Sequence, residues 1–333
     1  MKKHLLLISI AIISCVSCQE NINYVDSLKG YPILFDSINT GEMLINDSLI
    51  LFASSKYPSY LLSLFNLKNG KHIDNFIQKG NGPNDFLGIN MMNVIFEEKG
   101  AAYIWIYAYN EQKVIEFNLD KASASQPPLD SIFSFPWSDQ HLAPFNYIFR
   151  LDTSSTLIKT PLESLYEDGN DLSLPKYQII DTKSRNIKRE YKIYNQTITN
   201  KTNKIYSPSI YYLTTDQIKP DLSKVVISMG LLAQINILDL ESGKLTGYRL
   251  KDTPDFSYLT KDVDMFNIYY KSTTASNKYI YSLFVNKPFT PQKGIASSNE
   301  IHVFDWNGNF IQKLILDHNI DKIRLDVQNN ILY

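Results

Sequence analysis

The chain is 333 residues long, and its 33 basic and 34 acidic side chains nearly cancel, to a formal net charge of −1 at pH 7. No run of basic residues stands out, which excludes nucleic-acid binding through an electropositive surface. The 22 tyrosines and 17 phenylalanines favour β-strands, because aromatic side chains fit the pleated surface of a sheet. At this length an all-β chain is most economically one large sandwich, solenoid or propeller.

The first residues have the pattern of a secretory signal. A short basic segment over residues 1–3 precedes an apolar run over residues 5–13, which is too short to span a bilayer as a helix. The run is followed by Cys15 and Cys18, and the small Ser17 before Cys18 resembles the lipobox of bacterial lipoproteins. This resemblance implies that Cys18 is lipidated and becomes the new N-terminus, with Cys15 as the alternative acceptor.

The expected organisation is a signal peptide over residues 1–17, a polar tether over 18–29 and one domain over 30–333. The chain has only two cysteines. Lipidation of Cys18 therefore leaves the domain without a thiol for a disulfide, a zinc site or a nucleophile. We expect an exported protein, anchored to the bacterial cell envelope at the outer membrane through its lipid alone.

A short pattern recurs along the chain: an apolar residue, Asp or Asn, a few residues that often include Asn-Gly or Ser-Gly, and then an apolar run. Glycine and asparagine supply the positive φ of a tight hairpin, and the Asp or Asn side chain can cap the turn. The anchors of these hairpins are Asn66, Asn118, Asp181, Asp239 and Asp305. With the strand-like runs before them, they predict four-stranded units within residues 49–77, 93–135, 147–191, 209–250 and 266–315.

Two apolar segments remain, over residues 31–38 at one end and 320–333 at the other. A propeller closes its ring to protect the edge strands. We therefore expect a strand over 31–38 to be the outermost strand of a sixth blade, beside two C-terminal strands. The prediction is an all-β, six-bladed β-propeller of four-stranded antiparallel blades, closed by an N-terminal strand, with its last blade one strand short.

The segment over residues 79–86 reads Lys-Gly-Asn-Gly-Pro-Asn-Asp-Phe, and its glycines and proline exclude a helix or strand. We expect it to join the first two blades. It resembles the Gly-x-Gly-Pro-x-Glu-Phe/Tyr signature of the six-bladed β-propeller lipoproteins of Bacteroidetes, termed TolB-like or NHL-like, with Asp85 in place of the glutamate. The resemblance implies a lipid-anchored, exported propeller and no particular biochemical activity.

The same loop holds two candidate ligand contacts, Asn81 and Asp85. Its glycines let backbone amides approach a ligand, and the Asp85 carboxylate can accept hydrogen bonds. The favoured interpretation is nevertheless structural: the loop packs the crossover between two blades, with Phe86 as an apolar plug.

Three further candidates lie elsewhere. Asp262 and Asp264 precede a predicted inner strand, where paired carboxylates can hold a cation or act as acid and base, although exposed aspartates are common. Trp137 lies in a loop-like segment and can stack on a sugar, although aromatic residues of blades more often pack in the core.

Histidine is sparse after the signal, and no two of His72, His141, His302 and His318 have the spacing of metal ligands. Gly-x-Ser-x-Gly, His-Glu-x-x-His and phosphate-loop motifs do not occur. We therefore predict no metal and no cofactor.

The leading hypothesis is a non-enzymatic propeller that binds a protein, peptide or polysaccharide ligand across one face. The alternative is a lyase or hydrolase with a metal or carboxylate site in the central channel. Convergence of three of His72, His141, His302, Asp262 and Asp264 would favour the enzyme. A channel lined by aliphatic side chains and hydroxyl groups would favour the binding module.

Overall fold

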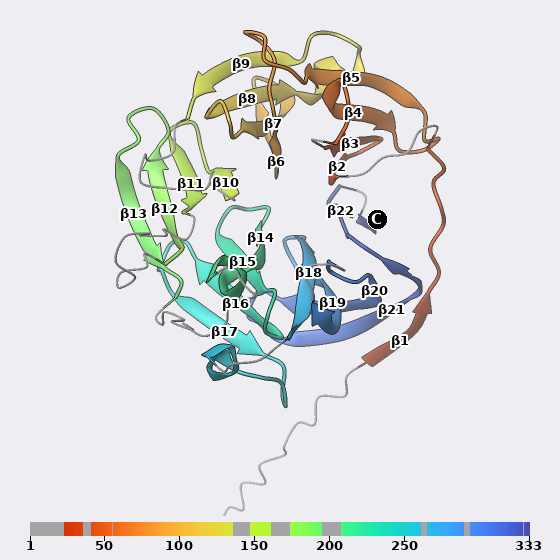
Figure 1. Ribbon diagram of the computed structural model, residues 1–333, viewed down its shortest axis with the longest axis vertical. Helices are drawn as coiled ribbons and strands as arrows, with labels where there is room; N and C mark the ends of the chain where they lie inside the picture. Colours follow the sequence, from red (N-terminus) through yellow and green to blue (C-terminus); the bar gives the residue numbers. More distant parts are fainter. Residues whose placement is uncertain are drawn as a thin grey trace, which may run out of the picture.

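The computed structural model is a ring of β-sheets around a common axis, with the sheets set like the blades of a propeller (Figure 1). Each blade has four antiparallel strands that run in chain order from this axis to the rim. The predicted all-β propeller of four-stranded antiparallel blades is confirmed. The structure describes residues 23–35, 41–54, 56–135, 147–160, 174–194, 208–260, 265–289, 294–328 and 330–333.

These ranges form five four-stranded blades, which we number in chain order. Blades one and two consist of β2 (Glu42–Asn46), β3 (Leu49–Ala53), β4 (Tyr60–Asn66), β5 (His72–Gln78), β6 (Asn90–Glu98), β7 (Ala101–Ala108), β8 (Lys113–Asn118) and β9 (Leu129–Ser134). Blades three to five consist of β10 (Tyr147–Arg150), β11 (Ser155–Lys159), β12 (Lys176–Asp181), β13 (Ile187–Lys192), β14 (Thr214–Ile218), β15 (Lys224–Met229), β16 (Gln234–Asp239), β17 (Leu245–Arg249), β18 (Phe266–Ala275), β19 (Tyr279–Phe289), β20 (Ser298–Asp305) and β21 (Phe310–Ile320). The connections hold the short helices α1 (Leu119–Ser123), η1 (Pro208–Tyr212) and η2 (Phe256–Thr260). Within the described ranges, no helix is long and apolar enough to cross a membrane.

The place of a strand within its blade explains its composition. β4 is buried at every position from Leu61 to Phe65, because both faces of a middle strand of the blade pack against neighbouring blades. β13 lies at the rim and buries only Tyr191. The core lies between blades: Phe76 of blade one meets Phe117 of blade two edge-on, with ring centroids 5.3 Å apart.

Four of the five predicted hairpin tips are confirmed, whereas Asn118 caps the N-terminus of α1, the short helix between β8 and β9. The side-chain oxygen of Asn66 accepts hydrogen bonds from the backbone N–H groups of Lys68 (2.9 Å) and Asn69 (3.2 Å). The corresponding side-chain oxygens of Asn118, Asp181, Asp239 and Asp305 accept backbone N–H groups in the same way.

Because strands alternate in direction, the turns after the first and third strands of every blade lie on one face of the ring, here termed the hairpin face. The connections from each outer strand to the next blade lie on the opposite, crossover face.

Two inner strands differ from the sequence prediction. β2 precedes the first predicted strand of blade one, and the inner strand of blade four is β14, whereas residues 208–212 form the helix η1. β14 reads Thr-Thr-Asp-Gln-Ile and carries no apolar alternation. Its polar side chains make hydrogen bonds with blades three and five, which the local sequence does not reveal.

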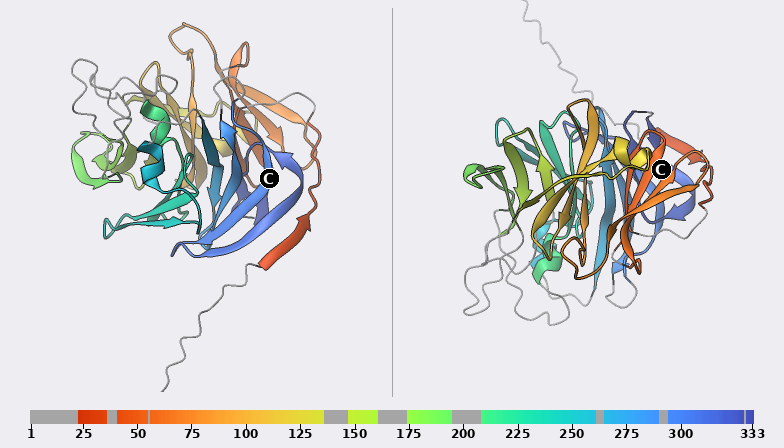
Figure 2. Two further views of the ribbon diagram at one scale, coloured as in Figure 1. Left: turned by 60° about the horizontal axis from the view of Figure 1, so that its bottom comes forward. Right: turned by 90° about the horizontal axis from the view of Figure 1, so that it is seen from above.

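The N-terminal strand also differs from the prediction. Residues 23–28, placed in the tether by the sequence, form β1 (Asn23–Leu28), which pairs in parallel with the outer strand β21 of blade five (Figures 1 and 2). β1 thereby covers the edge of blade five. Residues 31–35, the described part of the expected strand, adopt no regular structure. Pro32 lacks an N–H for a sheet ladder, and Phe35 instead packs edge-on against Phe52 and Phe65 of blade one, each at 5.5 Å.

The last two strands, β22 (Leu325–Asp326) and β23 (Ile331–Leu332), form a hairpin between blades five and one. The segment before it joins the two blades. The hydroxyl of Ser272 in blade five accepts the N–H of Ile323 at 3.2 Å. The carboxylate of Glu42 in blade one binds Lys322 Nζ at 2.6 Å and Arg324 Nη2 at 3.3 Å. The predicted pair of C-terminal strands is confirmed, but no N-terminal strand from the described residues pairs with it.

Candidate functional site

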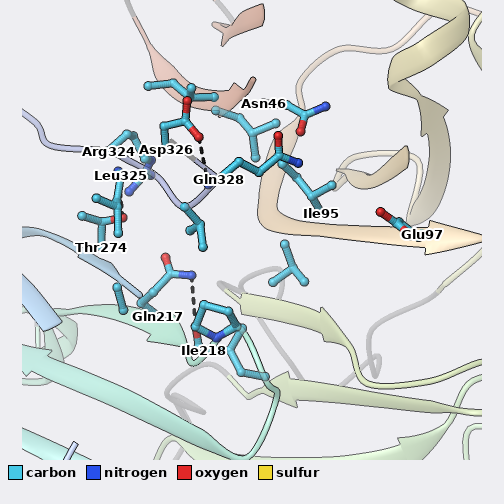
Figure 3. A pocket seen from close by; sticks show the side chains of 16 residues that line it. Asn46, Ile95, Glu97, Gln217, Ile218, Thr274, Arg324, Leu325, Asp326 and Gln328 are labelled. Carbon is cyan, nitrogen blue, oxygen red and sulfur yellow. Dashed lines mark hydrogen bonds between the residues drawn. The ribbon is translucent and has the colours of Figure 1, made fainter. Parts of the chain in front are cut away.

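The channel opens on the hairpin face as a cavity of about 260 Å³. Its walls are the ends of the inner strands β2, β6, β14 and β18, together with β22 and the turn that follows it (Figure 3). Inner strands run from the crossover face to the hairpin face, so their last residues surround the channel mouth. Four blades and the C-terminal hairpin therefore contribute to one site.

Most of the cavity wall is aliphatic. The apolar lining residues are Leu44, Ile45, Val94, Ile95, Ile218, Pro220, Ala275, Leu325 and Val327. Amide and hydroxyl groups come from Asn46, Gln217, Thr274 and Gln328. Among the described lining residues none is aromatic. This wall suits a ligand that presents aliphatic groups and amide or hydroxyl groups together.

Two of the charged lining residues are used within the protein. Arg324 donates from Nε to the carbonyl of Met43 at 2.7 Å and pairs with Glu42. Burial lowers the pKa of the Arg324 guanidinium, against the opposing effect of the Glu42 carboxylate. Asp326 is buried and accepts the backbone N–H of Gln328 at 3.0 Å, which shapes the turn at the rim. Glu97 is the exposed carboxylate at the cavity.

A buried polar network lies deeper, between blades three and four. Lys159 Nζ binds Asp216 Oδ2 and Thr214 Oγ1, each at 2.6 Å, and the Tyr177 hydroxyl donates to the same Asp216 oxygen at 2.6 Å. The Tyr147 hydroxyl donates to the Thr214 carbonyl at 3.1 Å. Burial, and then the Asp216 carboxylate, raises the pKa of Tyr177 well above its usual range, so Tyr177 remains a donor.

None of the candidate residues expected from the sequence belongs to this network. A signal for it exists: Lys159 follows the apolar Leu157 and Ile158 in one strand, and Asp216 is the sole charge of β14. A lone charge in a buried strand needs a partner of opposite sign. Which two charges meet depends on blade packing, because 57 residues separate them.

The predicted loop contacts lie on the other face of the ring. Asp85 Oδ2 accepts the N–H of Gly82 at 3.1 Å, and a Cβ on Gly80 would overlap the same carboxylate. Phe86 is buried in the core between blades one and two. Asn81 is exposed. The loop connects β5 to β6 on the crossover face, so Asn81 and Asp85 do not line the cavity.

The remaining predicted residues do not converge in the described part of the chain. His72 is exposed on β5, whereas His302 is buried within blade five beside Glu300 and Tyr270. Trp137, His141, Asp262, Asp264 and the lipidation candidates Cys15 and Cys18 lie outside the described residues. Within the described ranges, no group of three His, Cys, Asp or Glu side chains is placed to hold a metal ion.

The chain is similar to several known propellers. A model of the family described as "TolB-like 6-blade propeller-like" matches residues 41–328. A solved member of the DUF4221 family from Bacteroides vulgatus has 11% sequence identity and a TM-score of 0.51, with 86% of this chain and 85% of that one covered. A protein described as exported, from Bacteroides fragilis, has 14% identity and a TM-score of 0.48, with 88% and 75% covered. No curated protein matches the chain.

Proposed function

Because the chain belongs to the TolB-like six-blade propeller family, we propose that it is an exported binding module, held at the bacterial cell envelope by a lipid on Cys18. The signal-like segment and Ser17 before Cys18 support the lipid anchor. We further propose that the hairpin of β22 and β23 is the inner half of a sixth blade. Its place between blades five and one, and the six-blade description of the family, support this assignment.

The observation that carries the binding function is the cavity at the channel mouth. Its aliphatic walls carry the side-chain amides of Asn46, Gln217 and Gln328. A polypeptide segment offers the matching groups, since its backbone amides alternate with side chains. A polysaccharide is less well matched, because no aromatic ring among the described lining residues can stack on a sugar face. The ligand we propose is therefore a protein segment.

No observation in the described channel favours the lyase or hydrolase alternative. His72 and His302 belong to different blades and do not line the cavity. The Asp216 carboxylate has no exposed surface, and Lys159 and Tyr177 occupy one of its oxygens, so it supports packing between blades.

Capture from envelope extracts tests the binding function. The bait is the full lipoprotein and its Val327→Arg variant, which places a charge in the cavity rim. The control is Leu87→Arg, since Leu87 is similarly exposed (46% against 49% for Val327) but lies on the crossover side. We expect wild type and Leu87→Arg to retain the same polypeptide, and Val327→Arg to bind the purified polypeptide at least tenfold more weakly.

Two outcomes would contradict the proposal. Equal affinity of Val327→Arg and wild type would remove the cavity from the binding site. Retention of a polymer that survives protease treatment of the extract would exclude a polypeptide ligand.

A further inference from the structure

The register of β1 fixes where the chain enters the propeller. Asn23 lies opposite Gln312, and Leu28 lies opposite Leu316, in a parallel pair. β21 begins at Phe310, directly after the hairpin tip anchored by Asp305. The start of β1 therefore lies at the hairpin face, and β1 runs from there towards the crossover face (Figure 2).

The distance from this entry point to the proposed lipid is short. Five residue steps separate Cys18 from Asn23, and a fully extended chain covers at most about 18 Å in five steps. A six-residue strand such as β15 is about 20 Å long, before its loops are added. If the crossover face lay against the membrane, Cys18 would have to pass the full height of blade five before its lipid could enter the bilayer. That distance exceeds the reach of the five-residue segment.

We propose that the hairpin face, with the mouth of the channel cavity, faces the membrane, and that the cavity takes a polypeptide segment presented at the bilayer surface. This inference rests on the lipid anchor and the polypeptide ligand of the proposed function. It adds the orientation of the propeller and the place from which its partner must approach.

The chemistry of the rim favours a polypeptide over a lipid headgroup. Glu97 is an exposed carboxylate at the cavity and would repel a phosphate group, while Arg324 is already paired with Glu42. Lys188, at the start of the outer strand of blade three on this face, is paired with Asp181 at 3.2 Å. Val327 in the rim and Ile331 in the adjoining strand are 49% and 47% exposed, which offers apolar contact to a docked segment.

Fluorescence quenching in vesicles tests the orientation. The lipidated protein is inserted into vesicles of phosphatidylethanolamine and phosphatidylglycerol that carry a nitroxide on some headgroups. Gln328→Cys reports the cavity rim, and Asn84→Cys reports the crossover face; both positions are exposed, and the lipidated Cys18 has no free thiol. We expect at least twofold stronger quenching of a dye at position 328 than at position 84.

Equal or reversed quenching would overturn the orientation. A twelve-residue Gly/Ser insertion after residue 22 is expected to reduce the difference, because it removes the limit on reach; an unchanged difference would also overturn the argument. Flotation separates the two proposals. If the wild type does not float with vesicles, or the Cys18→Ser variant floats equally well, the anchor itself fails.

Cross-linking tests the partner. A photoreactive group on Gln328→Cys in intact cells is expected to capture a membrane-associated polypeptide, which the same group on Asn84→Cys does not capture. Capture of lipid alone, or of a polypeptide that stays soluble after cell lysis, would overturn the proposed source of the ligand.

Discussion

Lys159 and Asp216 show how single residues join two blades. Both side chains are buried, and transfer of charge from water is costly unless each charge is paired and hydrogen-bonded. Lys159 satisfies this with Asp216 and Thr214, and Asp216 also accepts the Tyr177 hydroxyl. The network therefore specifies which faces of blades three and four meet.

Removing one charge of this pair should be strongly destabilising. Lys159→Met leaves the Asp216 carboxylate buried without its cation, and we expect a loss of about 3–5 kcal/mol in the free energy of unfolding by urea. The control is Lys188→Met, which breaks a more exposed pair with Asp181 and should cost no more than about 1 kcal/mol. Similar losses in the two variants would show that the network does not stabilise the blade interface.

His302 is expected to make stability depend on pH. Burial lowers its pKa, although the hydrogen bond that His302 Nε2 donates to the Glu300 carboxylate opposes this effect. The unfolded chain then binds a proton more readily than the folded chain, so stability is full above about pH 6.5 and falls as the pH decreases below that value. We expect His302→Gln to flatten the decrease in urea midpoint between pH 7 and pH 5. Parallel profiles for variant and wild type would contradict this prediction.

At the scale of the element, the hairpin tips combine turn chemistry with packing. Gly70 has φ +68° and Gly100 has φ +76°, so both occupy backbone conformations that favour glycine. A Cβ on Gly70 would overlap the carbonyl of Leu34, whereas nothing lies within 4 Å of a Cβ on Gly100. The first tip thus holds the segment over residues 31–35 against blade one, and the second is an ordinary turn.

These two glycines form a matched pair for mutation. Gly100→Ala should cost about 1–2 kcal/mol, from the left-handed backbone alone. Gly70→Ala should cost more and should increase hydrogen exchange at residues 33–35, because Leu34 must move. Equal losses in melting temperature, with unchanged exchange, would show that the N-terminal segment is not held by this tip.

At the scale of the whole molecule, the ring is closed by ion pairs and by a chain segment that contacts both blade five and blade one. Glu42 of blade one binds Lys322 and Arg324, and Ser272 of blade five binds the intervening Ile323. The segment over residues 322–324 is thereby attached to both neighbours. On the outside, β1 on blade five and Phe35 on blade one span the same gap.

This closure predicts an acid-sensitive ring. Burial alone would raise the pKa of Glu42, but Lys322 and then Arg324 outweigh it and lower the pKa. The stabilisation is therefore present above the unfolded pKa of about 4.3 and is lost as the pH falls through the lower folded value. Glu42→Gln should lower the melting temperature at pH 7 and lower it less at pH 3. The control is Glu97→Gln at the exposed rim; an equal loss there would contradict a specific closure.

The predictable part of the fold is local. Hairpin tips such as Asn66 and Asp305 were found because an Asx side chain and a glycine act within a few residues. β4 and the other middle strands were found because burial on both faces makes a strand uniformly apolar. β14 was missed for the opposite reason: its polar residues are satisfied by blades three and five. The N-terminal strand was expected over residues 31–38 because that segment is apolar, although it contains Pro32. The sequence does not show that the edge of β21 is free to pair with residues 23–28.

The candidate site depended on tertiary packing to a greater degree than the fold did. The amino-acid order alone predicted an export signal, a β-propeller and the turns that punctuate it, since these predictions follow from short-range patterns of polarity and backbone freedom. The unusual loop made Asn81 and Asp85 candidate ligand contacts, although a structural role was favoured. The hydrogen bond from the Gly82 N–H to Asp85 and the packing of Phe86 agree with that structural role. Three features depended on the tertiary structure: the cavity, the closure of the ring through Glu42, and the entry of β1 at the hairpin face. Each arises because strands from both ends of the chain meet around one axis. No local pattern encodes which strand ends share a channel, because that is decided by the packing of whole blades.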